Sequence, residues 1–401
     1  MSEIRELFLR HLAQTSEAPI GLEVERAEGS WLYSTDGRRY LDMIAGIGVS
    51  ALGHGHPAVL GAITRQLRRH LHVMVYGEYI IEAQAKLAAR LAAVLPAGLD
   101  RVYFTNSGAE AIEGALKTAR KHTAREAFVA FDGAYHGDTM GALALAGNDG
   151  FRAPFGRLPG PIRHLPYDNE AALDAIDSNV AAVIVEPVQA EGGVRIPRRN
   201  FIEALRERCD RSGALLVFDE VLTGLGRTGK LFALEHFGVV PDLMVLAKAV
   251  GGGLPLGAFC GRDEIIAKLS RNPPLGHITT FGGHPLSCAA GLASLEIIVA
   301  ERLWERAERT GTLLRRSLKR LIGPEITEVR GIGLLAGLQF AEATTARRFV
   351  AETIARGVIV NWTLNADTVV RLAPPLTIDA SEIDFAVDAM AQALAATRGG
   401  N

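Results

Sequence analysis

The sequence is short of cysteines, aromatic residues and long apolar runs, and each shortage excludes a class of protein. Its three cysteines, Cys209, Cys260 and Cys288, are far apart and odd in number, which argues against a disulfide framework and against a zinc site. No apolar run approaches the length of a membrane span, and the charged, amphipathic N-terminus lacks a secretory signal pattern. We therefore expect a cytoplasmic protein with reduced thiols and no bound metal.

A strong excess of charge of either sign is also missing. Lysine and arginine number 43 against 45 aspartates and glutamates, which gives a formal net charge of −2. Such a balance gives no reason to expect nucleic acid or an anionic membrane as a partner. Hydrophobic residues nevertheless make up 48% of the 401 residues, enough for a large buried core. The length suits one large domain with a smaller companion.

Short apolar runs dominate the middle of the chain. Each ends in polar or glycine-rich residues, and most are followed by helical spacing, which is the pattern of buried parallel strands. The runs occupy residues 101–105, 127–131, 181–185, 214–218 and 243–246. Because ligands of such sheets bind beyond the carboxyl ends of the strands, the polar residues there form one candidate site. These residues are Asn106-Ser107-Gly108, Asp132-Gly133, Glu186-Pro187, Asp219-Glu220 and Lys248.

The pattern changes after about residue 286. A long charged helical stretch, 300–321, is followed by a short β-rich region. The β-rich segments lie at 331–339, 358–360 and 369–372. An earlier segment, 29–43, alternates like a hairpin around Asp36-Gly37, and we assign it to the same unit.

These patterns predict two domains. The large domain covers residues 51–285. The smaller one has an α+β composition and is made from residues 286–401 together with the N-terminal segment 1–50.

Two of the polar segments have the form of ligand-binding turns. Ser107 followed by Glu110 is a capping box, so a helix begins there, and Gly108 and Ala109 leave the first N–H groups open to a phosphate. Tyr135 before His136-Gly137 would place an aromatic ring against a planar ligand. Taken alone, each pattern also fits a simpler role, namely a plain capped helix or a tyrosine packed at a turn.

Asp219 and Lys248 follow two further apolar runs. A carboxylate at the mouth of the sheet can pair with a heteroaromatic N–H, and Val221, two residues on, would press on the same ring. A lysine that is partly desolvated has a lowered pKa and becomes a competent amine nucleophile. Taken alone, a lysine before Gly251-Gly252-Gly253 is more often a solvated strand end.

Two further patterns look like known sites but lack essential parts. Gly224-Leu-Gly226-Arg-Thr-Gly229 with Lys230 matches a dinucleotide loop and most of a P-loop, but Leu231 stands where a magnesium-binding serine or threonine is needed. His54-Gly55-His56 has no carboxylate or thiol set nearby. We therefore assign neither a nucleotide nor a metal to these segments.

Together the segments resemble the class III aminotransferases of the ornithine, acetylornithine and ω-amino-acid type. The most specific part is Asp219-Glu-Val-Leu-Thr-Gly-Leu-Gly-Arg-Thr-Gly229, followed by Lys248, which lies 29 residues after Asp219, and by Gly251-Gly-Gly-Leu-Pro-Leu-Gly257. Independent matches are Ser107-Gly108-Ala109, Tyr135-His136-Gly137 and Thr279-Thr280-Phe-Gly-Gly283. The resemblance covers residues 29–376, nearly the whole chain.

The resemblance implies an α/β protein of pyridoxal-phosphate-dependent transferase fold type I, like aspartate aminotransferase. It has a mostly parallel central sheet in a large domain plus a smaller α+β domain. The implied cofactor is pyridoxal 5′-phosphate, bound to Lys248 as a Schiff base, and Lys248 also moves the substrate's proton. Asp219 is implied to pair with the pyridinium nitrogen and make the ring an electron sink.

The resemblance also implies the rest of the cofactor site. Its residues are Ser107, Gly108 and Ala109 at the phosphate, Tyr135 and Val221 on the two ring faces, and His136 and Glu186 beside them. Thr280 is implied to reach the phosphate from the neighbouring subunit. A homodimer with shared active sites follows.

Glu191 and Arg371 match the family's switch glutamate and the arginine that it shields. A guanidinium group suits bidentate capture of an α-carboxylate. When an amine without a carboxylate enters, Glu191 can neutralise Arg371, since a buried unpaired charge is costly. A permanent structural ion pair is the alternative. Tyr76 and Trp362 are predicted to line the substrate pocket.

Three positions depart from the family's usual residues. Asp138, Leu222 and His284 stand where an arginine, a glutamine and an asparagine are common. We therefore predict a ping-pong aminotransferase that moves an amino group from an amine or ω-amino acid to an α-keto acid, either pyruvate or 2-oxoglutarate. Acetylornithine, ornithine, 4-aminobutyrate or diaminopelargonate aminotransferase, and a glutamate-semialdehyde-type aminomutase, remain open alternatives.

Overall fold

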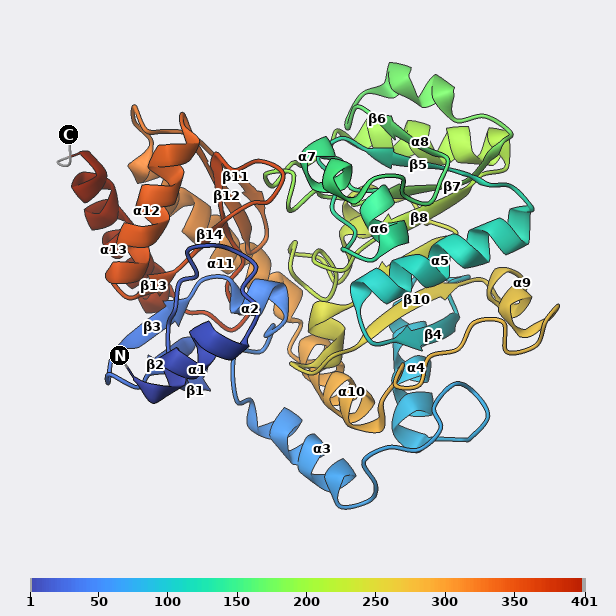
Figure 1. The fold of residues 1–401 in the computed structure, drawn as a ribbon, viewed down its shortest axis with the longest axis horizontal. Helices are drawn as coiled ribbons and strands as arrows, with labels where there is room; N and C mark the ends of the chain where they lie inside the picture. The colour runs from blue at the N-terminus through green and yellow to red at the C-terminus, as the bar shows by residue number, and fades with distance from the viewer. Residues whose placement is uncertain (1, 399–401) are drawn as a thin grey trace.

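A seven-stranded sheet forms the centre of the larger half of the molecule in the computed structural model, which describes residues 2–398 (Figure 1). In spatial order its strands are β4 (Arg101–Thr105), β10 (Gly257–Gly261), β9 (Leu243–Leu246), β8 (Leu215–Asp219), β7 (Val180–Val185), β5 (Ala127–Phe131) and β6 (Ile162–Leu165). From β9 to β6 the neighbours are parallel, whereas β10 runs antiparallel to both β4 and β9. The predicted mostly parallel central sheet is therefore confirmed.

Five of these strands match the predicted apolar runs to within a residue, and two were not predicted. β6 (sequence IRHL) and β10 (sequence GAFCG) were missed. Both are short, and β10 begins and ends in glycine, a residue that is depleted in strands. Pairing on both edges holds β10 extended in spite of its weak local preference.

Helices cover both faces of this sheet. On β8, Leu215 and Val217 pack in a cluster with α5 (Gly108–Thr123), while Leu216 and Phe218 belong to the cluster that contains α8 (Arg199–Ser212). This alternation follows from the two-residue period of a strand, and it leaves every residue of β8 buried. Helices α4 (Glu82–Val94) and α10 (Pro285–Ala300) pack with the α8 cluster. The remaining short helices of this half are α3 (Pro57–Leu67), α6 (Met140–Ala144), α7 (Asp149–Arg152) and α9 (Asp263–Ile266).

Two four-stranded sheets form the other half of the molecule, to which both the N-terminal and the C-terminal regions contribute strands (Figure 1). One sheet has the order β1 (Val24–Glu28), β2 (Trp31–Ser34), β3 (Arg39–Asp42) and β13 (Val358–Ile359). The other has the order β11 (Ile326–Ile332), β12 (Leu335–Phe340), β15 (Val369–Leu372) and β14 (Asn361–Trp362). Their helices are α1 (Glu3–His11), α2 (Ala45–Gly48), α11 (Leu303–Leu318), α12 (Ala343–Ala355) and α13 (Ala380–Arg398).

The predicted hairpin at 29–43 is confirmed as β2 and β3, and β3 pairs in parallel with β13 of the C-terminal region. The segment 331–339, read as one β-rich stretch, instead spans the end of β11, a turn and most of β12. We propose the division into 1–50, 51–285 and 286–401 on the basis of the β3–β13 pairing. Residues 399–401, the end of the proposed C-terminal unit, lie outside the described residues.

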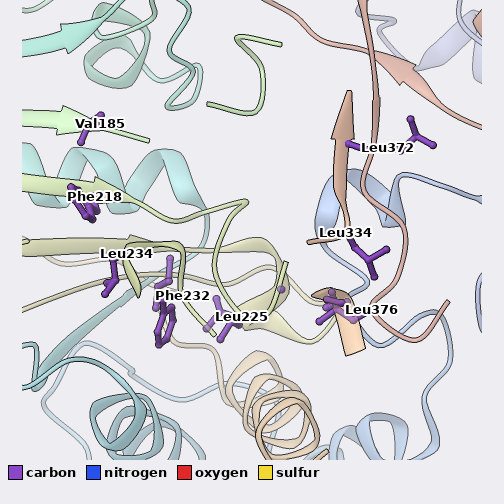
Figure 2. Close-up of a cluster of buried hydrophobic side chains, with 14 of the residues drawn as sticks. Val185, Phe218, Leu225, Phe232, Leu234, Leu334, Leu372 and Leu376 are labelled. Atoms are coloured by element: carbon purple, nitrogen blue, oxygen red, sulfur yellow. The ribbon is translucent and has the colours of Figure 1, made fainter. Parts of the chain in front are cut away.

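The hydrophobic core runs without a break between the two halves through the segment that follows β8. Figure 2 shows Leu225, Phe232 and Leu234 between Phe218 of β8 and Leu376 of the C-terminal region. Gly226 has a positive φ of 98°, and a Cβ there would lie 3.0 Å from the Leu376 side chain. The glycine-rich loop at 224–229, which resembles a nucleotide motif, therefore has a packing role in this fold. Its glycines allow neighbouring elements to lie close to the backbone.

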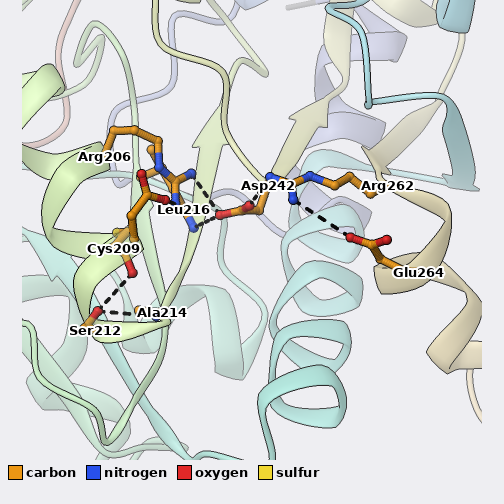
Figure 3. Close-up of polar contacts among 9 residues, drawn as sticks. Arg206, Cys209, Ser212, Ala214, Leu216, Asp242, Arg262 and Glu264 are labelled. Carbon is orange, nitrogen blue, oxygen red and sulfur yellow. Dashed lines mark hydrogen bonds and ion pairs between the residues drawn. The ribbon is translucent and has the colours of Figure 1, made fainter.

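Asp242 fixes the amino ends of β8 and β9. Its carboxylate accepts hydrogen bonds from the Leu216 backbone N–H at 2.8 Å, from Arg206 Nη1 at 2.9 Å and from Arg262 Nη2 at 2.8 Å (Figure 3). Two arginines from α8 and from the end of β10 thus neutralise one buried carboxylate. The opposite, carboxyl ends of these two strands lead to Asp219 and Lys248.

Candidate active site

A cavity of about 520 Å³ opens at the carboxyl ends of β4, β8 and β9. Most of the predicted site residues form its wall. They are Ser107, Gly108, Ala109, Tyr135, His136, Glu186, Glu191, Asp219, Val221 and Lys248. The volume lies within the range of small-molecule sites.

Lys248 is half-buried in the cavity wall, and its amine forms no hydrogen bond or ion pair with any residue from 2 to 398. Burial and the positive charge of Arg371 lower the pKa of Lys248 to about 8. Its backbone is held at a φ of +52°, a conformation that is strained for a lysine. A strained, desolvated and unpaired lysine is the arrangement expected of an amine nucleophile.

Asp219 is held by two contacts of its own. Its Oδ1 accepts the Val221 backbone N–H at 2.9 Å, and its Oδ2 lies 2.7 Å from His136 Nδ1. Burial lowers the pKa of His136, but the hydrogen bond and charge of Asp219 outweigh this effect and leave that pKa raised. The other ring nitrogen, Nε2, is buried and has no hydrogen-bond partner among residues 2–398. His136 therefore acts as a positioning residue for the Asp219 carboxylate.

Replacing His136 with phenylalanine is expected to weaken cofactor binding about tenfold or more, because Asp219 loses a hydrogen bond to a charged group. Equilibrium titration of the apoprotein with the cofactor measures this change. His136→Asn keeps a side-chain N–H and is expected to recover part of the affinity. Equal affinity in His136→Phe and the unmodified protein would show that Asp219 needs no such support.

The start of α5, residues 107–109, has the form of an anion-binding site. Ser107 Oγ accepts the Glu110 N–H at 3.1 Å, as the predicted capping box requires. Glu110, however, accepts the N–H of Asn106 at 2.8 Å and not that of Ser107. No described residue accepts a hydrogen bond from the N–H groups of Ser107, Gly108 or Ala109. Three adjacent unpaired N–H groups at the positive end of a helix of this length suit a phosphate.

Gly257 allows β10 to lie close to this anion-binding site. A Cβ at position 257 would lie 2.1 Å from the carbonyl oxygen of Ser107. Gly257→Ala is therefore expected to destabilise the fold by about 1–3 kcal/mol and to weaken cofactor binding. Urea unfolding and cofactor titration measure the two effects. Gly61→Ala on α3 is the matched control, since its Cβ meets only the flexible end of Arg65 and alanine favours a helix.

Glu186 connects the aromatic turn to the loop that carries Glu191. Its two carboxylate oxygens accept the backbone N–H groups of Tyr135 and Ala190, each at 3.0 Å. Burial raises the pKa of Glu186 to about 7. Glu186 thus fixes where the Tyr135 ring enters the cavity.

Glu191 and Arg371 form a buried ion pair beside the cavity. Arg371 Nη1 bonds to Glu191 Oε1, and Glu191 Oε2 also accepts the Leu364 backbone N–H at 2.9 Å. Arg371 comes from β15 and lies behind Glu191, which itself lines the cavity. The pair therefore places a neutralised guanidinium group next to the cavity wall.

Four predicted residues do not line the cavity of their own chain, namely Arg371, which contacts it only through Glu191, and three others. Thr280 is exposed on the segment before α10, Tyr76 is half-buried in the loop after α3, and Trp362 of β14 is 39% exposed. Their assignment to the site stays a prediction.

Several wall residues were not predicted, including Val49 and Leu254. Asn106, which was predicted as one of the polar residues at the strand ends, also lines the cavity. Its Nδ2 donates to Glu110 and to Thr279 Oγ1, at 2.8 and 2.9 Å. Val49 and Leu254 are ordinary apolar residues that carry no sequence signal.

The two histidines that resemble a metal pair have separate partners. His54 Nε2 lies 3.0 Å from Asp42 Oδ2, and His56 Nδ1 accepts the Ala58 N–H at the start of α3. Within residues 2–398 no group of three histidine, cysteine, aspartate or glutamate side chains is placed to hold a metal ion. In the same part of the chain, no helix is long and apolar enough to cross a membrane.

The family model described as aminotransferase class-III matches residues 12–394. The chain belongs to this family. It is 43% identical over 397 residues to the acetylornithine aminotransferase of Methanopyrus kandleri, covering 98% of this chain and all of that one. Among solved structures, an (S)-enantioselective omega-transaminase from Thermomicrobium roseum is similar, with a TM-score of 0.92, 33% identity and coverage of 98% and 97% of the two chains. The ornithine aminotransferase of Toxoplasma gondii, solved with partial occupancy of PLP at its active site, gives a TM-score of 0.91, 30% identity and coverage of 99% and 94%.

Class III aminotransferases depend on pyridoxal 5′-phosphate, so this chain is a pyridoxal-phosphate-dependent aminotransferase of fold type I. The described residues fit that cofactor. The unpaired N–H groups of Ser107, Gly108 and Ala109 suit its phosphate, and the unpaired amine of Lys248 suits its aldehyde. Gly108 keeps the space beside Val221 open, because a Cβ there would come within 3.1 Å of the valine side chain.

Proposed function

We propose that the enzyme transfers an amino group from an amine or ω-amino acid to an α-keto acid, pyruvate or 2-oxoglutarate, in two half-reactions at one site. The observation that carries this proposal is the Glu191–Arg371 pair at a cavity that also holds an unpaired lysine. In the half-reaction with the α-keto acid, Arg371 can bind the substrate's α-carboxylate. In the half-reaction with an amine that has no α-carboxylate, Glu191 can keep Arg371 neutralised.

Within this proposal each wall residue has one task. Ser107, Gly108 and Ala109 hold the phosphate, and Tyr135 and Val221 enclose the ring. Pyridoxal phosphate, when bound, supplies an electron sink for the substrate carbon that bears the amino group. Asp219 keeps the ring nitrogen protonated, and Lys248 Nζ takes the proton from that carbon and returns it to complete the transfer.

Acetylornithine aminotransferase is a second candidate, because relatives of that name are up to 43% identical over nearly the whole chain. Asp138 in the cavity wall distinguishes the two candidates. Its carboxylate repels a substrate carboxylate, which disfavours acetylornithine relative to a simple amine.

A half-reaction screen tests the proposal. The absorbance of the bound cofactor is followed while simple amines, 4-aminobutyrate, ornithine and N-acetylornithine are added one at a time, without a keto acid. We expect amines without a carboxylate to convert the cofactor at least as fast as N-acetylornithine does. Faster conversion by N-acetylornithine would favour the second candidate. Net turnover without any keto acid would indicate an aminomutase.

We also propose a homodimer in the cytoplasm. Large apolar side chains are exposed on α3, on the loop after it and on the segment before α10. They are Leu60, Leu67, Leu71, Ile80, Ile278 and Phe281. Such surfaces are typical of subunit contacts, and Thr280 lies among them. The three cysteines are free, which suits a reducing compartment.

A further inference from the structure

Asp138 lies in the cavity wall, and no cation neutralises it. Its side chain is exposed, and it forms no ion pair with any residue in the described part of the chain. The other carboxylates of the wall all have partners. Asp219 pairs with His136, Glu191 pairs with Arg371, and Glu186 accepts two backbone N–H groups.

Tyr135 holds Asp138 in place. The Tyr135 hydroxyl donates to Asp138 Oδ2 at 2.7 Å, and the Tyr135 N–H is bound to Glu186. Burial and the hydrogen bond to Asp138 raise the pKa of Tyr135 above its usual value. The hydroxyl therefore stays protonated and donates its hydrogen bond to Asp138. No described residue donates to the other oxygen, Oδ1, which leaves one acceptor free at the cavity.

The cations of the site are already engaged. Arg371 is bound by Glu191, and His136 by Asp219, while Lys248 is the amine that the cofactor requires. No other lysine or arginine lines the cavity among residues 2–398. A substrate carboxylate near Asp138 would therefore meet a like charge, whereas an ammonium group would meet the unpaired acceptor.

We propose that Asp138 recognises a second cationic group on the amino donor, so that diamines are preferred over ω-amino acids. This inference rests on the proposed aminotransferase function and narrows its substrate class. One ammonium of the donor reacts, and the other donates a charge-assisted hydrogen bond to Asp138 Oδ1. Because Asp138 is exposed, salt screens part of this attraction.

The test compares three donors of similar length that differ at the far end. Putrescine carries an ammonium there, butylamine a methyl group and 4-aminobutyrate a carboxylate. In the unmodified holoenzyme, kcat/KM of the amine half-reaction should fall in that order. In Asp138→Asn the ratio of putrescine to butylamine should fall about tenfold, mainly through KM, as expected when one charge-assisted hydrogen bond is lost. Asp138→Arg should place 4-aminobutyrate above putrescine.

Two outcomes separate this inference from the proposed function. If none of the donors converts the cofactor, the proposed function fails. If they react but the putrescine-to-butylamine ratio is the same in the unmodified protein and in Asp138→Asn, only the Asp138 assignment fails. If a variant does not fold, the salt dependence of the unmodified enzyme tests the Asp138 assignment. Raising the salt concentration should lower kcat/KM for putrescine more than for butylamine. An equal effect on both donors would overturn the assignment.

Discussion

Lys248→Ala is expected to lose covalent attachment of the cofactor and about 10⁴-fold or more in kcat, since in the proposed mechanism one amine both holds the cofactor and moves the proton. Within the described residues, Lys248 is the lysine of the cavity wall, and no other group there offers a neutral amine. Borohydride reduction followed by peptide mass spectrometry measures attachment, and steady-state assays measure kcat. In the unmodified protein the reduced cofactor should stay on the peptide that contains residue 248.

The exposed Lys230→Ala is the control for Lys248→Ala, and it should keep both attachment and activity. A Lys248→Ala protein that still retains the cofactor after borohydride treatment would refute the assignment. The pKa of about 8 adds a pH dependence. Attachment needs the neutral amine, so the rate at which the apoprotein recombines with the cofactor should rise as the pH increases to about 8 and then level off.

Arg371→Ala is expected to lower kcat/KM for the α-keto acid by about 10²–10³, because two charge-assisted hydrogen bonds to the carboxylate are lost. The half-reaction with butylamine should change less, since that donor has no carboxylate. The variant also leaves Glu191 buried and unpaired, so its free energy of unfolding should fall by about 3–5 kcal/mol. Separate half-reaction kinetics and urea unfolding measure these effects.

Adding Glu191→Gln to Arg371→Ala removes the unpaired charge. The double variant should therefore regain stability but not activity with the keto acid. Arg347→Ala is the control, because its ion pair with Asp367 is exposed and should contribute less than about 1 kcal/mol. If the keto acid and butylamine half-reactions lost activity equally in Arg371→Ala, the pair would be a structural one.

The elements that we propose to hold the cofactor could be predicted because their signals are local. An apolar run followed by a polar residue identified β8 with Asp219, and Ser107 followed by Glu110 identified the start of α5. β10 carries no such signal, since its glycines are needed for close approach and its extended form depends on two neighbours. The sequence pattern gave no packing role to the glycines of the loop at 224–229, because that role appears only where the two halves meet.

Lys248, Asp219 and the unpaired N–H groups of α5 are thus determined by the sequence, because strand and helix periodicity brings them to one edge of one sheet. The tertiary structure decided the surroundings of these groups. The Glu191–Arg371 bond joins residues 180 positions apart, and the His136–Asp219 bond joins residues 83 apart. Asp138 lacks a cationic partner within the described part of the chain because of the residues that pack around it. Pairing and desolvation depend on every neighbour in space, so they follow from the packed fold and not from any local pattern.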